Sequence, residues 1–222
     1  MEEKTHVEDK KNFMRKIPLF FTKIQKRFEA QQGARHMIFE ASDQARIASK
    51  RAIFAVHRED RLGANQQLVQ ARVSLEKAEK LLVRQPILRQ EGVYAAAKEE
   101  FVEAVLFSDY VQTGAFQKND QLFLEPAAFI GGLSDATGEI VRYAVREAGQ
   151  GRVEAVPRAR EAVETAVEFL LKMDLTGPLR QKADQAKRNL HALEQMVYEL
   201  RLSRGFSKPP LNSSSLYGEE TS

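Results

Sequence analysis

The stretch VYAAAKEEFVEAVLFSDYV, residues 93–111, indicates the fold class of this chain. Its apolar residues recur at the spacing of three and four that places them on one face of a helix. At about 100° per residue, one stripe of this helix holds Val93, Ala96, Ala97, Glu100, Glu103, Ala104, Phe107 and Val111. The stretch therefore predicts a helix in which two glutamates interrupt an otherwise apolar stripe.

The same helical spacing continues through nearly the whole sequence, and alternating β-branched runs bounded by turns are absent. We predict an all-α, single-domain bundle of about six to seven helices. Proline and glycine mark most of the boundaries, and the expected helices cover residues 7–60 with a bend near Pro18, 65–83, 91–114, 126–148, 154–173 and 178–202. Residues 117–124 are expected to be a connector. The domain should cover residues 1–206, followed by a flexible tail, 207–222, rich in proline and serine.

Length and composition restrict the chemistry of the chain. With 222 residues, 43% of them hydrophobic, the chain can build one sizeable core. It has no cysteine, so a metal would be held by carboxylates or the four histidines, which favours a hard ion such as Mg²⁺ or Mn²⁺. A charged amino terminus and the lack of a long apolar run lead us to expect a cytoplasmic protein with no membrane partner. The formal charge of +3 does not by itself indicate a nucleic-acid partner.

A second pair of acids lies in the helix expected at residues 126–148. The same projection gives a stripe, edged by glycines, of Asp135, Glu139, Arg142 and Arg146. A carboxylate that faces a core costs several kcal/mol unless it is paired, protonated or bound to metal. If the two acidic stripes converge, they can hold one or two Mg²⁺ ions, which activate water and neutralise charge on a phosphodiester.

The residues alone leave a structural interpretation open. Glu139 and Arg142 have the spacing of an ordinary ion pair along one helix, and the other two glutamates could pair with a neighbouring helix. Arg142 and Arg146 could bind phosphate, as could Lys50 and Arg51 in the first expected helix. Arg46, Lys50 and His57 project to one side of that first helix, where pairing with acids of adjacent helices is an equally open alternative to phosphate contact.

Four segments resemble the translin family, and the acidic ones look like those of its nuclease-active branch, translin-associated factor X. They are SKRAIFAVHR at 49–58, EFVEA at 100–104, LSDATGEI at 133–140 and VYELRLSRGF at 197–206. With the spacing between them, the resemblance covers most of residues 30–206. Matched position by position, the catalytic and metal-binding acids of that branch fall on Glu100, Glu103, Asp135 and Glu139.

The resemblance implies a helical bundle assembled into hollow oligomeric shells that enclose RNA and cut it endonucleolytically with Mg²⁺. We therefore expect a metal-dependent endoribonuclease that uses Mg²⁺ or Mn²⁺, with RNA contacts at Lys50, Arg51, Arg142 and Arg146. Its partners would be RNA and further copies of the chain, or a translin-type second subunit. The alternative is a non-catalytic oligomer of translin type that binds RNA or single-stranded DNA.

Overall fold

The computed structural model describes residues 18–117 and 125–205, and these residues are helical almost throughout. The elements are α1 (Leu19–His57), α2 (Arg61–Arg84), the short 3₁₀ helix η1 (Pro86–Gln90), α3 (Gly92–Thr113), α4 (Pro126–Gly149), α5 (Ala155–Leu171) and α6 (Gly177–Gly205). No strand occurs in these two ranges, so the predicted all-α class is confirmed. The expected C-terminal tail, most of the expected connector and residues 7–17 of the first expected helix lie outside the described residues.

Two predicted boundaries differ from the structure at the start of a helix. Pro18 has an extended backbone, with φ −54° and ψ 139°, and stands just before α1 rather than at a bend inside it. Proline supplies no backbone donor, which suits a position at the edge of a helix. The start of α2 lies four residues before the predicted one, because the Asp60 carboxylate accepts a hydrogen bond from the Gly63 amide and caps the first turn.

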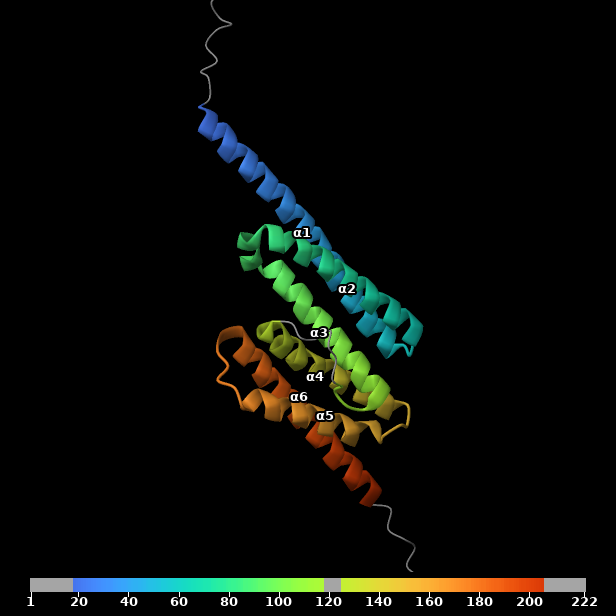
Figure 1. Ribbon diagram of the computed structural model, residues 1–222. Helices are drawn as coiled ribbons and strands as arrows, with labels where there is room; N and C mark the ends of the chain where they lie inside the picture. The colour runs from blue at the N-terminus through green and yellow to red at the C-terminus, as the bar shows by residue number, and fades with distance from the viewer. Residues whose placement is uncertain (1–17, 118–124, 206–222) are drawn as a thin grey trace, which may run out of the picture.

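The helices α1, α3, α4 and α6 run in one direction, and α2 and α5 run in the other (Figure 1). Two ion pairs agree with the parallel course of α1 and α3, because Arg35 and Lys50 of α1 meet Glu91, the N-cap residue of α3, and Glu100 in the same order along both helices. His57 of α1 and Lys182 of α6 both contact α4.

The close approach of α3 and α4 depends on one glycine. A Cβ atom added to Gly132 would lie 2.6 Å from the backbone oxygen of Glu99 and 2.6 Å from the Cβ of Val102. The backbone and the branched side chain cannot retreat easily, so this crossing requires glycine. Because α3 and α4 approach so closely at Gly132, the residues one to two turns further along both helices lie side by side.

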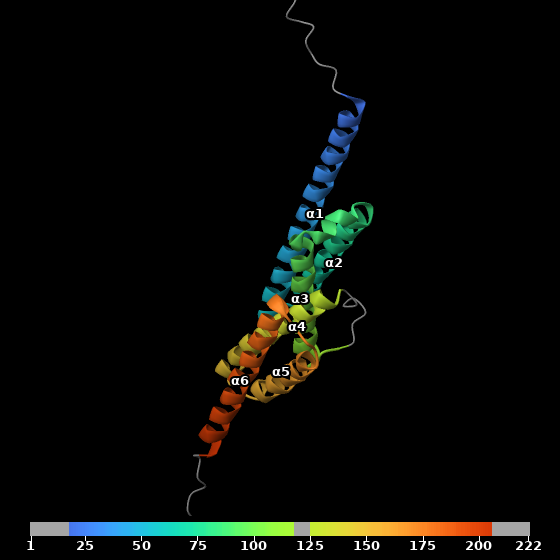
Figure 2. The same ribbon diagram turned by 90° about the vertical axis from the view of Figure 1, so that its left-hand side faces the viewer.

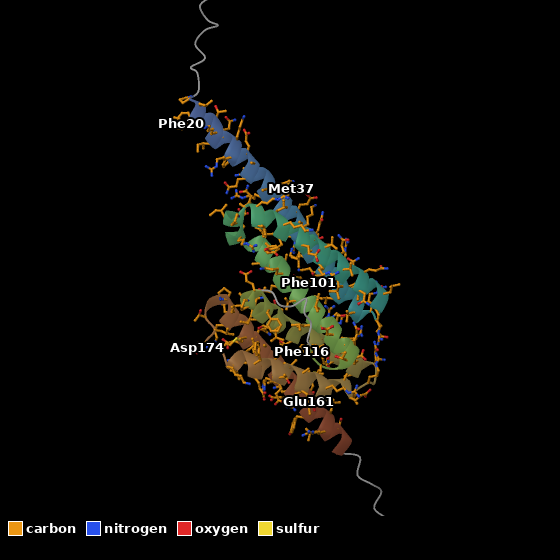
Figure 3. All side chains as sticks on the ribbon, in the orientation of Figure 1. Phe20, Met37, Phe101, Phe116, Glu161 and Asp174 are labelled. Carbon is orange, nitrogen blue, oxygen red and sulfur yellow. The ribbon has the colours of Figure 1, made fainter. Side chains whose placement is uncertain are left out.

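The core surrounds α3, which is buried on most of its circumference. Its interior positions include Phe101, Val102 and Phe107, all at most 2% exposed. The core face of α1 is rich in small residues, which lets α2 and α3 pack closely against it, with full burial of Ala41, Ala45 and Ala52. Figure 3 shows Phe101 in the middle of the bundle. Among the described helices, none is long and apolar enough to cross a membrane.

The first third of α1 extends beyond the other helices, as both views show (Figures 1 and 2). The last contacts with the bundle lie near Arg35, which pairs with Glu91 at 2.6 Å, and near Met37. The segment Leu19–Ala34 precedes this point and is about 24 Å long. We call it the α1 arm.

Candidate functional site

Three of the four acids singled out from the sequence line one pocket between α1, α3 and α4. The pocket has a volume of about 220 Å³ and is lined by Lys50, Ile53, Phe54, Glu100, Glu103, Glu139 and Arg142. We call it the acid pocket. Glu100 and Glu103 are one turn apart on α3, and Glu139 projects toward them from α4 because the two helices cross so closely at Gly132.

Glu103 is the carboxylate least compensated in this pocket. Burial, followed by the negative charges of Glu100, Asp135 and Glu139, raises its pKa to about 8, and Lys182 opposes the shift. No described residue forms a hydrogen bond or an ion pair with it. A carboxyl group in this setting is ready either to hold a proton near neutral pH or to accept a cation.

The other two acids of the pocket have partners on α1 and α4. Burial raises the pKa of Glu100, although Lys50 Nζ, 3.6 Å from its Oε2 atom, works against the shift. The pKa of Glu139 is lowered, chiefly by its hydrogen bond with His57, whose Nε2 atom lies 2.5 Å from Oε2. Arg142 approaches the same carboxylate at 3.6 Å.

His57 is buried, at 6% exposure, and its ring lies 4.7 Å from the ring of Phe107. It therefore ties the end of α1 to the acid of α4. The sequence placed His57 on one side of the first helix with Lys50 but did not identify Glu139 as its partner, since nothing in the local pattern specifies a contact between residues 82 positions apart.

Asp135 lies beside the acid pocket rather than in its lining. Its carboxylate pairs with Lys182 of α6, which also pairs with Glu99 of α3. Asp135 still acts on the pocket, because its charge contributes to the raised pKa values of Glu100 and Glu103. Neither Lys182 nor Glu99 was singled out from the sequence.

The donor set consists of carboxylate oxygens, which suits a hard divalent cation. The unpaired Glu103, among three like-charged neighbours, is the observation that fits a cation best. Yet in the part of the chain that the structure describes, no three histidine or acidic side chains already stand close enough together to hold a metal ion. Metal binding would therefore require the carboxylates to turn toward one another. The ion pair between Lys182 and Asp135 would also have to break.

The four cations predicted to contact RNA fall into different places. Lys50 and Arg142 line the acid pocket. Arg51 is exposed and is not part of the lining. Arg146 lies further along α4, where it pairs with Glu147 at 3.1 Å and with Glu59 at 3.7 Å. The structure thus brings two of the four to the acids.

Arg146 belongs to a second group of charges at the far end of α4. We call it the arginine cluster; it comprises Glu59, Tyr143, Arg146, Glu147 and Arg152. Glu147 is only 5% exposed, and Arg152 Nε lies 2.6 Å from its Oε2 atom. The hydrogen bond from Arg152 is the main reason that the pKa of Glu147 is lowered.

Fold and site together define an all-α bundle with a carboxylate pocket between three parallel helices. The sequence model of the Translin family matches residues 33–204, and the chain belongs to this family. No curated protein matches the sequence. The predicted family membership is confirmed.

Solved structures show the same fold. The chain is similar to the crystal structure of AfC3PO, with 27% identity and a TM-score of 0.76 over 84% of this chain and 99% of that one. The structure of AfC3PO in complex with duplex RNA has 25% identity to this chain and a TM-score of 0.66, over 86% of this chain and 100% of that one. The crystal structure of apo-NeC3PO, at 20% identity, has a TM-score of 0.74 over 82% and 97% and supports the fold alone.

Proposed function

We propose that this protein is a metal-dependent endoribonuclease that binds RNA within an oligomer and cleaves it at the acid pocket. The proposal rests on the setting of Glu103. Its carboxylate is unpaired among like charges, in a pocket that is also lined by Lys50 and Arg142. The structure of AfC3PO with duplex RNA supports RNA as the ligand. The resemblance of the acidic segments to translin-associated factor X supports cleavage.

The residues that would hold the metal are Glu100, Glu103, Asp135 and Glu139, and the expected ion is Mg²⁺, with Mn²⁺ as the alternative. When bound, such an ion lowers the pKa of a bound water and neutralises charge on the phosphodiester. Occupancy by a cation would favour the ionised form of Glu103, whose pKa of about 8 otherwise keeps it largely protonated at neutral pH.

The surrounding residues have separate tasks in this proposal. Lys50 and Arg142, both exposed and at the pocket, bind phosphate oxygens of the substrate. His57 keeps Glu139 ionised and oriented by its hydrogen bond. Arg51 and Arg146 remain further candidates for RNA contact, Arg51 from its exposed position on α1 and Arg146 only after leaving Glu147.

A cleavage assay with labelled RNA tests the proposal. The wild-type protein should cut RNA with Mg²⁺ or Mn²⁺ and stop when the metal is chelated. Glu103→Gln keeps the shape of the side chain and removes its charge, and it should abolish cutting while RNA binding persists. Glu168→Gln, at an exposed position of α5, is the matched control and should cut normally. Normal cutting by Glu103→Gln would refute the assignment.

A non-catalytic RNA-binding or single-stranded-DNA-binding protein is the second candidate. It is favoured by one observation: Lys50, Arg142 and Lys182 already neutralise three of the acids without any metal. Such a protein would bind RNA with strong salt dependence and leave it intact with either metal present. The same assay, run beside a binding titration, separates the two functions.

The exposed surface of the α1 arm supports assembly. Phe20, Phe21, Ile24 and Phe28 are each 53–61% exposed, and Figure 3 shows Phe20 at the outer end of the helix. Apolar groups gathered in this way usually mark an interface. The mass of the purified protein in solution tests for a homo-oligomer, and a persistent monomer that binds no RNA would instead point to a translin-type partner subunit.

A further inference from the structure

Phe54 is an exposed aromatic side chain at the mouth of the acid pocket. It is 56% exposed, although the positions on either side of it on α1, Ile53 and Ala55, contribute to the core. The ring itself is not part of the core cluster. A single exposed phenylalanine is ordinary on a protein surface. Phe54 differs from the other exposed apolar side chains of α1 because it lines the acid pocket.

The neighbours of Phe54 carry the charge that a nucleic-acid strand requires. Lys50 lies one turn before Phe54 on α1, and Arg58, the C-cap residue just after the helix, follows four residues after it, so the three side chains form a column. The Arg58 guanidinium is 5.7 Å from the ring centroid. Arg142 faces the same pocket from α4. An aromatic ring between cations is the arrangement by which proteins hold single-stranded nucleic acid, with bases stacked on rings and phosphates on the cations.

We infer that Phe54 stacks against an unpaired base of the substrate and so positions the adjoining phosphate over the acid pocket. The inference rests on the proposed function and assigns to Phe54 the positioning of an unpaired or flipped-out nucleotide at the point of cleavage. A base within a continuous duplex is covered by its neighbours on both faces and cannot stack on the ring. Phe54 is thus a specificity-determining residue.

A second copy of the chain is the competing occupant of this surface. The location of Phe54 favours RNA, because the ring lines a pocket whose other walls are mainly charged. The cores of protein interfaces are depleted of charged residues. Lys50, Glu100, Glu103, Glu139 and Arg142 would all have to be desolvated if a protein surface covered Phe54.

The chain offers a matched control. Phe39 lies on the same helix and is also 56% exposed, but it does not line the acid pocket. Binding is measured in the Glu103→Gln background with a fluorescein-labelled, unstructured single strand of adenosines and cytidines, and with a blunt-ended, perfectly paired duplex. Phe54→Ala should weaken single-strand binding by about 5- to 160-fold, the range expected for one stacked base, whereas Phe39→Ala should leave it unchanged. Phe54→Trp should restore binding.

Three outcomes would overturn the inference. They are equal losses for Phe54→Ala and Phe39→Ala, equal losses for the single strand and the blunt-ended duplex, or a fall in the oligomer mass of Phe54→Ala, which would assign the ring to a protein interface. Cleavage provides a second readout if the wild type cuts RNA. An abasic ribose next to the mapped cut should slow the wild type and leave Phe54→Ala unaffected. If the wild type cuts nothing, the proposed function fails, while the binding comparison still decides the role of Phe54.

Discussion

The acid pocket and the arginine cluster both include residues of α4, where Glu139 and Glu147 are eight residues apart. The two sites differ in how fully the charge of a buried acid is compensated. Glu147 is nearly fully buried, and two arginines satisfy it, which lowers its pKa. Glu103 in the acid pocket has no such partner, and its pKa is raised to about 8. A buried carboxylate that is fully paired contributes to structure, whereas one left unpaired in an open pocket is available for chemistry.

The largest effect should come from breaking the arginine cluster. Glu147→Ala removes the buried acceptor of the hydrogen bonds from Arg146 and Arg152. Hydrogen bonds to a charged group contribute about 1.5–3 kcal/mol each, so the free energy of unfolding should fall by about 3 kcal/mol. Urea-induced unfolding followed by circular dichroism measures the loss. RNA cleavage by the remaining folded protein should be unchanged. Preserved stability would mean that the cluster is not structural.

A smaller loss is expected at the crossing that brings the acids together. Gly132→Ala places a methyl group against the backbone of Glu99 and should cost about 2 kcal/mol while moving α3 away from α4. RNA cleavage should also fall, because the acids of the two helices move apart. Gly138→Ala is the control, since its Cβ would lie 3.6 Å from Asn189 Nδ2, an ordinary contact. That change should leave stability unchanged or raise it slightly, because alanine favours helix; equal losses for both variants would contradict the prediction.

Glu103→Gln should raise the free energy of unfolding, in contrast to the two preceding variants, and the size of the gain should depend on pH. The folded protein keeps a proton on Glu103 that the unfolded chain releases near pH 4.5, so the wild type loses stability as the pH rises from about 4.5 to about 8. The glutamine removes this penalty. We expect a gain of about 1–3 kcal/mol at pH 9 and little change at pH 4. Urea unfolding at the two pH values checks this, and a gain independent of pH would show that the charge of Glu103 is not the cause.

The smallest effect should come from Glu59, the only described non-glycine residue with a positive φ, at 62°. Glu59→Gly removes the backbone strain, worth about 1 kcal/mol, and also removes exposed ion pairs with Arg146 and Arg152, worth up to about 1 kcal/mol. The net change in stability should lie within about 0.5 kcal/mol. Glu59→Ala loses the pairs without relieving the strain and should be the less stable of the two in thermal unfolding.

The sequence could predict the helices and the two acidic stripes, because both follow from local periodicity. It could not predict His57 against Glu139 or Lys182 against Asp135, since these contacts depend on how distant helices pack. Arg146 shows where projection misleads. It shares the angular position of Asp135, but eleven residues of helix separate the two by about 16 Å, so Arg146 joins a different cluster.

The order of the helices along the chain also sets the order in which the acid pocket can assemble during synthesis. A nascent chain that has emerged only through Thr113 can pack α1, α2 and α3, and it carries Glu100 and Glu103 without either acid of α4. The pocket gains Glu139 when α4 docks, and Lys182 reaches Asp135 only after most of the chain has left the ribosome. A chain interrupted before α4 therefore holds half of the carboxylates and no pocket.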